Sequence, residues 1–234
     1  LTGDDSLRRR PMARVIAPLR RMGAQISART GDTLAPIAIK GGSLRAIKYE
    51  MPIMSAQVKS ALLLAGLYIE EETQIVESGP TRDHTEKMLL AMGAPVVRTD
   101  KMVSIRRPGR LNPLPLCVPG DISSAAPWLV LGACHPDAEL TIEGVGINPT
   151  RTGLLDILIR MGARLELADE RIVGGETVAD IVVQTSDLHG TVVEGEDVPR
   201  AIDELPLIGL LGCFAEGETV VRDAAELRVK ESNR

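Results

Sequence analysis

The sequence predicts a mixed α/β (α+β) fold in which a unit of about 70 residues is repeated. Two observations predict it. A helical segment ending in Met-Gly-Ala occurs three times, with Met22, Met92 and Met161 placed 70 and 69 residues apart. A second, almost entirely apolar helical segment also recurs, and a β-branched segment follows each of its copies. Each unit is therefore expected to contain a strand, a helix, a strand, a helix and further strands.

The first helix of the repeat is amphipathic. Its apolar residues recur at spacings of three and four, and a glycine follows (Gly23, Gly93 or Gly162) where a helix C-cap requires positive φ. A stretch favouring β structure comes next in all three copies. The helices are predicted over residues 10–24, 84–94 and 153–163.

The second helix of the repeat is apolar almost all round, which is typical of a helix buried under a sheet. Its three copies are predicted over residues 55–66, 123–132 and 203–212. Ser55, Ser123 and Asp203 open them and are suitable N-caps. The strands that follow are predicted at 73–76, 140–142 and 219–221.

A Pro-rich stretch at 113–120 predicts a domain boundary. Residues 1–117 are expected to be part of a first repeat domain, and residues 118–234 part of a second. The last copy of the repeat stops within its Met-Gly-Ala helix, and Leu1 falls just before the corresponding helix of the first copy. Because repeat units bury their faces against neighbours, we expect a fragment truncated at both ends.

Composition excludes several classes of protein. The chain has 27 basic and 32 acidic residues, which argues against binding to nucleic acid or to an anionic membrane surface. A stacking platform for single-stranded nucleic acid is excluded because only four residues are aromatic: Tyr49, Tyr68, Trp128 and Phe214. No apolar run is long enough for a membrane span.

The cysteines and histidines predict neither a disulfide framework nor a zinc site, and a reducing cytoplasm is expected. They are widely scattered, without a CxxC motif: Cys117, Cys134, Cys213, His84, His135 and His189. No nucleotide-binding glycine loop, GxSxG, HExxH or EF-hand loop occurs.

Polar residues gather at the predicted helix starts. Ser55, Ala56 and Gln57 open an apolar helix, and Lys59 follows one turn later. A hydroxyl, an amide and the positive end of a helix can together form a site for an anion or a hydroxyl group. The alternative is a plain serine N-cap.

Arginines occupy equivalent helix starts in successive units. Arg8, Arg9, Arg10 and Arg14 surround the first, and the later units have Arg82 and Arg151. A cation there is unfavourable to the helix dipole unless an anionic ligand is also present, so the pattern predicts anion binding. Solvated surface charge is the alternative.

The last copy of the repeat contains a candidate base. Asp203 and Glu204 begin a buried helix, and Lys230, Glu231 and Arg234 follow it, with the two cations four residues apart. Such a group can hold an anion and move a proton. An ordinary charged helix surface would look similar.

These segments together resemble the EPSP synthase family, whose members are 3-phosphoshikimate 1-carboxyvinyltransferases. They occur in family order from end to end: 1–4, 10–12, 55–66, 82–89, 119–126, 148–153, 202–206 and 226–234. The Ser-Ala-Gln and Arg-Asp-His-Thr-Glu forms are similar to the bacterial subgroup that is less sensitive to glyphosate. The resemblance implies a two-domain enolpyruvyl transferase-like architecture with three βαβαββ units in each domain.

The reaction implied by the resemblance moves the enolpyruvyl group of phosphoenolpyruvate to the 5-hydroxyl of shikimate 3-phosphate and releases phosphate, a step of aromatic amino-acid biosynthesis. These two small molecules would be the partners, with no metal or organic cofactor, no nucleic acid and no membrane. The full-length enzyme is expected to be a cytoplasmic monomer.

Residue roles carry over by position only. The resemblance implies that Ser55, Ala56, Gln57 and Arg82 bind shikimate 3-phosphate, that Gln57 also reaches phosphoenolpyruvate, and that Arg10 and Arg234 hold phosphoenolpyruvate. Asp203 would take the proton of the 5-hydroxyl, Lys230 would bridge that hydroxyl and the phosphate, and Glu231 would handle the proton at the methylene carbon. Asn233 departs from the family's Lys-Glu-Ser-Asp-Arg pattern.

Family segments outside this chain include an N-terminal Lys-Ser…Arg segment, a Gly-Asn-Ala-Gly-Thr loop and a C-terminal arginine. We therefore expect the chain alone to fold at least in part but to turn over little or no substrate. Two alternatives stay open: an enolpyruvyl transferase acting on UDP-N-acetylglucosamine, and a non-catalytic ligand-binding fragment.

Overall fold

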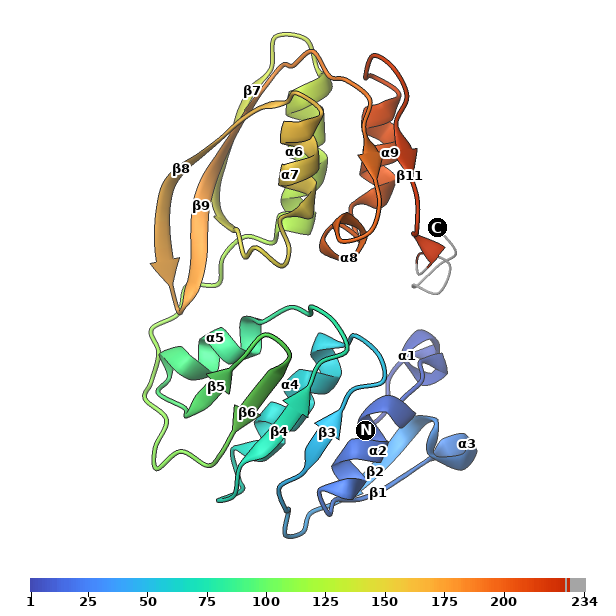
Figure 1. Cartoon of the computed structure of the whole chain (residues 1–234), viewed down its shortest axis with the longest axis vertical. Coiled ribbons are helices and arrows are strands. Elements are labelled where there is room, and N and C mark those ends of the chain that lie inside the picture. The colour runs from blue at the N-terminus through green and yellow to red at the C-terminus, as the bar shows by residue number, and fades with distance from the viewer. Residues whose placement is uncertain (226, 228–234) are drawn as a thin grey trace. The chain divides into compact units, whose positions relative to one another are not determined.

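The computed structural model describes residues 1–225 and 227 and divides into two compact units, Leu1–Leu114 and Pro115–Arg234 (Figure 1). The first unit contains α1 (Asp5–Arg9), α2 (Ala13–Arg21), β1 (Gln25–Ala28), α3 (Arg29–Asp32), β2 (Leu34–Lys40), β3 (Lys48–Glu50), α4 (Ala56–Gly66), β4 (Thr73–Val76), α5 (His84–Ala91), β5 (Val96–Arg98) and β6 (Met102–Ile105). The second contains α6 (Ile122–Cys134), β7 (Glu139–Gly146), α7 (Gly153–Arg160), β8 (Arg164–Val173), β9 (Glu176–Gln184), β10 (Val192–Val193), α8 (Asp197–Arg200), α9 (Leu205–Gly212) and β11 (Val220–Val221). The mixed content confirms the predicted α/β class.

One complete repeat occupies residues 48–105 of the first unit. Its four strands are ordered β3-β4-β6-β5, with β3 parallel to β4 and the remaining pairs antiparallel. Helix α4 forms the crossover between the parallel strands, and α5 leads from β4 to β5. The element order is therefore βαβαββ.

The second unit repeats this topology. Its three-stranded sheet is ordered β7-β9-β8, and Gly120 forms a parallel bridge to Val145 of β7. The segment at Gly120 thus takes the place of β3, and α6 takes the place of α4.

Partial copies of the repeat flank these two. In the second unit, the parallel pair β10-β11, joined through α9, corresponds to the first half of the repeat. In the first unit, α2 with the antiparallel pair β1-β2 corresponds to the second half of the repeat. The predicted repeat is present in the described residues.

The Met-Gly-Ala endings act as predicted. Gly23, Gly93 and Gly162 follow α2, α5 and α7 with φ of +106°, +81° and +92°. A side chain at such φ would be strained, whereas glycine adopts it without cost. Each glycine therefore ends its helix and turns the chain into the next strand.

The helix starts differ in detail from the prediction. Helices α5 and α7 begin at His84 and Gly153, as predicted. Helix α2 begins at Ala13, three residues later than the predicted residue 10. In the second unit, α6 is capped by Asp121, which accepts a hydrogen bond from the N–H of Ser123, so Ser123 lies inside the helix. Glu204, not Asp203, is the N-cap residue of α9. In both cases the chain becomes helical at a neighbouring residue, a difference that propensity alone does not fix.

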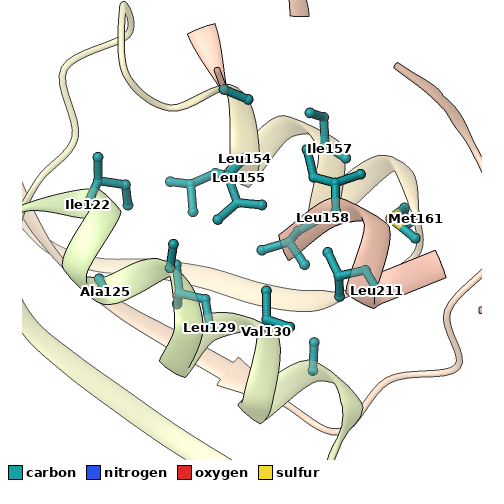
Figure 2. Close-up of a cluster of buried hydrophobic side chains, with 14 of the residues drawn as sticks. Ile122, Ala125, Leu129, Val130, Leu154, Leu155, Ile157, Leu158, Met161 and Leu211 are labelled. Atoms are coloured by element: carbon teal, nitrogen blue, oxygen red, sulfur yellow. The ribbon is translucent and has the colours of Figure 1, made fainter. Parts of the chain in front are cut away.

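The core of the second unit is aliphatic, as the scarcity of aromatic residues predicts. Side chains from α6, α7 and α9 point toward one another (Figure 2) and pack with the inner faces of β7 and β9. Leu129, Leu154 and Leu158 are completely buried there. A separate cluster, aliphatic apart from Tyr49, fills the first unit around Met22, Leu62 and Ile105.

The three apolar helices are less buried than predicted. Each packs one side into the core of its unit, but Leu64, Trp128, Leu131 and Leu210 on the other side are about half exposed. The sequence pattern has nearly the same hydrophobicity all round and so could not distinguish these two sides. Among the described residues, none of the helices is both long and apolar enough to cross a bilayer.

Asp180 of β9 forms hydrogen bonds at the register shifts of both neighbouring strands, β7 and β8. The register of β7 shifts between Ile142 and Val145, and that of β8 shifts between Ala168 and Arg171. The Asp180 carboxylate accepts hydrogen bonds from the N–H of Gly144 (2.8 Å) and from Arg171 Nη1 (3.3 Å). The Gly144 hydrogen bond, assisted by Arg171, holds the pKa of the Asp180 carboxyl below its ordinary value.

Asp180→Asn is therefore expected to destabilise the second unit at neutral pH and to have less effect in acid. A carboxyl with a lowered folded-state pKa contributes stability above its unfolded pKa of about 3.9, and that stability is lost as the pH falls through the folded value. Urea unfolding at pH 7 and pH 3, followed by Trp128 fluorescence, measures the difference. Asp169→Asn is the control, because Asp169 contacts Arg171 but is largely exposed. An equal loss for Asp180→Asn at both pH values would contradict the assignment.

Candidate functional site

The start of α4 presents the predicted polar group. Ser55 is its N-cap, as predicted, and Ser55 Oγ accepts a hydrogen bond from the N–H of Val58 (3.4 Å). Ala56 and Gln57 form the first turn, whose backbone N–H groups have no partner within the helix. The Gln57 side chain is exposed, and its Oε1 accepts from Arg14 Nη2 of α2 (3.0 Å). The structure thus places a guanidinium beside the amide, at the positive end of a helix.

Arg82 and Arg10 also lie near helix starts. Arg82 is partly buried and lies two residues before α5, whereas Arg10 is exposed and lies three residues before α2. The second turn of α4 contacts the first turn of α5, since Ser60 and Thr85 share a hydrogen bond of 2.6 Å between their hydroxyl groups. The segment that carries Arg82 therefore enters α5 next to the beginning of α4.

Two of the predicted helix-entry arginines lie elsewhere. Arg8 and Arg9 are in the last turn of α1, a short helix that begins after its N-cap Asp4. Cations are favourable at a helix C-terminus, so the dipole argument made for these two residues was wrong. Helix α1 is not among the predicted helices. The signal was an aspartate N-cap followed by Asp5 in the first turn.

Lys59 is also not part of an exposed anion site. Its side chain has no solvent exposure, and Nζ lies 2.9 Å from Glu77 Oε1 and 2.6 Å from Glu86 Oε1. A lysine already held by two buried carboxylates is not available to a ligand. Neither glutamate was singled out by the sequence analysis, since the contacts cross from α4 to the end of β4 and to α5.

The second unit has its own polar group at the start of α6. Arg151 Nη2 donates hydrogen bonds to Asp121 Oδ1 (3.0 Å) and to Ser123 Oγ (2.7 Å). Ser123 Oγ in turn donates to Glu204 Oε1, which is buried. Asp203, the candidate base, is partly buried directly before Glu204. The start of α6 is therefore linked through side chains to the start of α9.

The remaining candidates cannot be placed. Lys230, Glu231 and Arg234 lie outside the described residues. In the described part of the chain, no group of three or more His, Cys, Asp and Glu side chains could hold a metal ion.

Comparison with known proteins identifies the family. The family model for EPSP synthase (3-phosphoshikimate 1-carboxyvinyltransferase) matches residues 1–234. Two curated relatives carry the name 3-phosphoshikimate 1-carboxyvinyltransferase. The one from Desulforudis audaxviator is 53% identical over 234 residues, and the one from Acaryochloris marina is 52% identical over 236 residues. These matches cover all of this chain but 54% and 53% of the relatives, so the chain spans about half their length.

Comparison with solved structures gives the same family. The EPSP synthase from Acinetobacter baumannii has a TM-score of 0.89 and 48% identity, over 97% of this chain and 52% of that one. The enolpyruvyl transferase NikO from Streptomyces tendae is 19% identical with a TM-score of 0.71, over 93% of this chain and 52% of that one, and shows likeness of fold alone. The glyphosate-related subgroup stays a prediction. With a match over every residue and relatives above 50% identity, this chain belongs to the EPSP synthase family.

Proposed function

We propose that this chain forms part of an enzyme that transfers the enolpyruvyl group of phosphoenolpyruvate to the 5-hydroxyl of shikimate 3-phosphate and releases phosphate. One observation carries the proposal. The candidate residues of the described part lie at or within three residues of helix starts, as a site for two phosphorylated anions requires: Arg10, Ser55, Ala56, Gln57, Arg82 and Asp203. As parts of the same proposal, the longer enzyme acts in the cytoplasm as a monomer.

The start of α4 is proposed to bind shikimate 3-phosphate. The first-turn N–H groups of α4 can donate to phosphate oxygens, and Arg82 supplies a full positive charge from the adjoining segment. Gln57 is proposed to contact both substrates, while Arg10 contacts phosphoenolpyruvate. The 3.0 Å hydrogen bond from Arg14 to Gln57 orients the amide and adds positive charge beside it.

Proton transfer is assigned to the second unit. Asp203 is proposed to take the proton of the 5-hydroxyl as the oxygen forms its bond to the enolpyruvyl carbon. Three further residues of the proposal lie outside the described residues. Lys230 is proposed to bridge the 5-hydroxyl and the phosphate, and Glu231 to move the proton at the methylene carbon. Arg234 is proposed to hold phosphoenolpyruvate. A carboxylate and an ammonium group in these roles supply general base and electrostatic catalysis.

Calorimetric titration of the chain with shikimate 3-phosphate tests the substrate. Arg82→Met is expected to raise its Kd by about tenfold to a hundredfold, because a charge-assisted hydrogen bond to phosphate is lost. Arg107→Met is the matched control, since Arg107 belongs to the same unit and forms an exposed ion pair with Glu70. Lys230→Ala, compared with Lys101→Ala, tests the residue outside the described part. No heat of binding to the unmodified chain would refute the proposal for this chain.

The same experiment separates the alternatives. Binding of UDP-N-acetylglucosamine in place of shikimate 3-phosphate would favour the other enolpyruvyl transferase, and binding of neither compound would favour a non-catalytic role. Phosphate release is measured in parallel with both substrates. Rapid turnover by the chain alone would contradict the expectation that it binds substrate but turns over little of it.

A further inference from the structure

A buried cluster of four charged side chains lies inside the first unit and contains none of the residues proposed above to contact a substrate. It consists of Lys59, Glu77, Glu86 and Arg98. The Lys59 side chain is completely buried, the two glutamate side chains are 3% exposed, and only Arg98 reaches solvent. The four charges sum to zero, and a more exposed carboxylate, that of Asp83, also lies 3.9 Å from Arg98. Because charged residues are seldom buried, its position in the fold requires an explanation.

The cluster joins four elements of one repeat. Lys59 of α4 bridges Glu77, the residue after β4, and Glu86 in the first turn of α5. Arg98, at the end of β5, lies 3.2 Å from Glu86 and 3.8 Å from Glu77. Lys59 therefore fixes both ends of the segment that connects β4 to α5.

That connecting segment carries a candidate substrate residue. Glu77 Oε1, besides contacting Lys59, accepts a hydrogen bond of 2.6 Å from the hydroxyl of Thr81. Thr81 is buried and directly precedes Arg82. A continuous chain of contacts thus runs from Lys59 through Glu77 to Thr81, the residue before Arg82.

The cluster is not arranged for stability alone. Burying charges requires desolvation, and well-packed apolar side chains of similar size are often at least as stable. One Glu86 oxygen, Oε2, is buried without a hydrogen-bond partner among the described residues, which adds to this cost. Apolar residues could not provide the directional hydrogen bond that Glu77 accepts from the Thr81 hydroxyl.

We propose that Lys59, Glu77 and Thr81 are positioning residues, which order segment 77–82 and thereby place Arg82 for the phosphate of shikimate 3-phosphate. The consequence for binding rests on the proposed function, but the ordering of the segment does not. Their action is through Arg82, so loss of the hold is expected to weaken binding of shikimate 3-phosphate more than binding of phosphoenolpyruvate.

Three variants of the whole chain test the ordering by amide hydrogen exchange without substrate. Thr81→Val removes the hydroxyl but keeps the shape and all four charges, and Thr81→Ser restores the hydroxyl. Thr85→Val is the matched control, since it removes a hydrogen bond of equal length that does not hold segment 77–82. Thr81→Val is expected to speed exchange in segment 77–82 about tenfold, whereas Thr81→Ser and Thr85→Val leave it near the original rate.

The role of Lys59 is tested with a charge-balanced double variant, Lys59→Met with Glu77→Gln, which keeps the Glu86–Arg98 pair. It is also expected to speed exchange in segment 77–82. If the double variant does not fold, Thr81→Val still decides the proposal. Unchanged exchange in Thr81→Val, or an equal increase in Thr85→Val, would overturn the proposal.

Calorimetry then tests the consequence for binding. In Thr81→Val the Kd for shikimate 3-phosphate is expected to rise about tenfold, with less change for phosphoenolpyruvate and rescue by Thr81→Ser. Faster exchange with unchanged binding would overturn the positioning role. If the unmodified chain does not bind shikimate 3-phosphate, the proposed function fails for this chain, and the exchange result decides the ordering by itself.

Discussion

Lys59→Met is expected to lower the free energy of unfolding of the first unit by about 3–5 kcal/mol. The substitution keeps the length and apolar stem of the side chain but removes its charge. Glu77 and Glu86 are then left as two buried carboxylates with Arg98, which is partly exposed, as their remaining cation in the cluster. Breaking a buried ion pair on one side costs far more than the pair itself contributes, because the abandoned charge has no water to solvate it.

Urea unfolding followed by far-UV circular dichroism, together with hydrogen exchange of α4 and β4, measures this loss. The matched control is Arg107→Met, which removes an arginine whose side chain is 57% exposed from its pair with Glu70. An exposed pair contributes about 0–1 kcal/mol, so the control should remain close to the original chain. A loss of similar size in both variants would show that burial of the cluster is not the cause.

Leu158→Ala is expected to lower the free energy of unfolding of the second unit by about 2–5 kcal/mol. Leu158 is on the inner side of α7, completely buried among the side chains of α6 and α9 (Figure 2). Truncation removes apolar contacts and leaves a cavity that the surrounding helices can close only in part.

The effect can be followed by the fluorescence of Trp128, the single tryptophan of the sequence, which belongs to the second unit. Ile159→Ala is the control on the same helix, because Ile159 is 56% exposed and its truncation leaves no internal cavity. The control is expected to lose less than about 1 kcal/mol. Comparable midpoints for the two variants would contradict the assignment of Leu158 to the core.

Much of the fold could be predicted because each copy of the repeat contains recognisable patterns of neighbouring residues. The Met-Gly-Ala endings marked the ends of α2, α5 and α7, since only glycine adopts the required φ without strain. Ser55 was identified as a cap by its position before an apolar run. The same reasoning located the polar group at the start of α4, although the substrate that it binds is still a proposal.

The predictions that failed have two causes: one local signal was missed, and the other residues have partners in distant parts of the chain. Arg8 and Arg9 were placed at a helix entry, but an unpredicted short helix ends there. Lys59 was grouped with the polar start of α4 because it follows one turn later, yet its partners are 18 and 27 residues away in the sequence. The link from Arg151 through Ser123 to Glu204 was likewise invisible to local patterns.

The sequence by itself determined the repeat, the class of fold and the helix starts at which polar residues gather, because capping, periodicity and chain reversal depend on neighbouring residues. Only the tertiary structure decided which of those polar residues reach a partner and which remain at the surface. Burial and ion pairing depend on elements brought together by packing, and a lysine has the same appearance in the sequence whether it faces solvent or two buried glutamates.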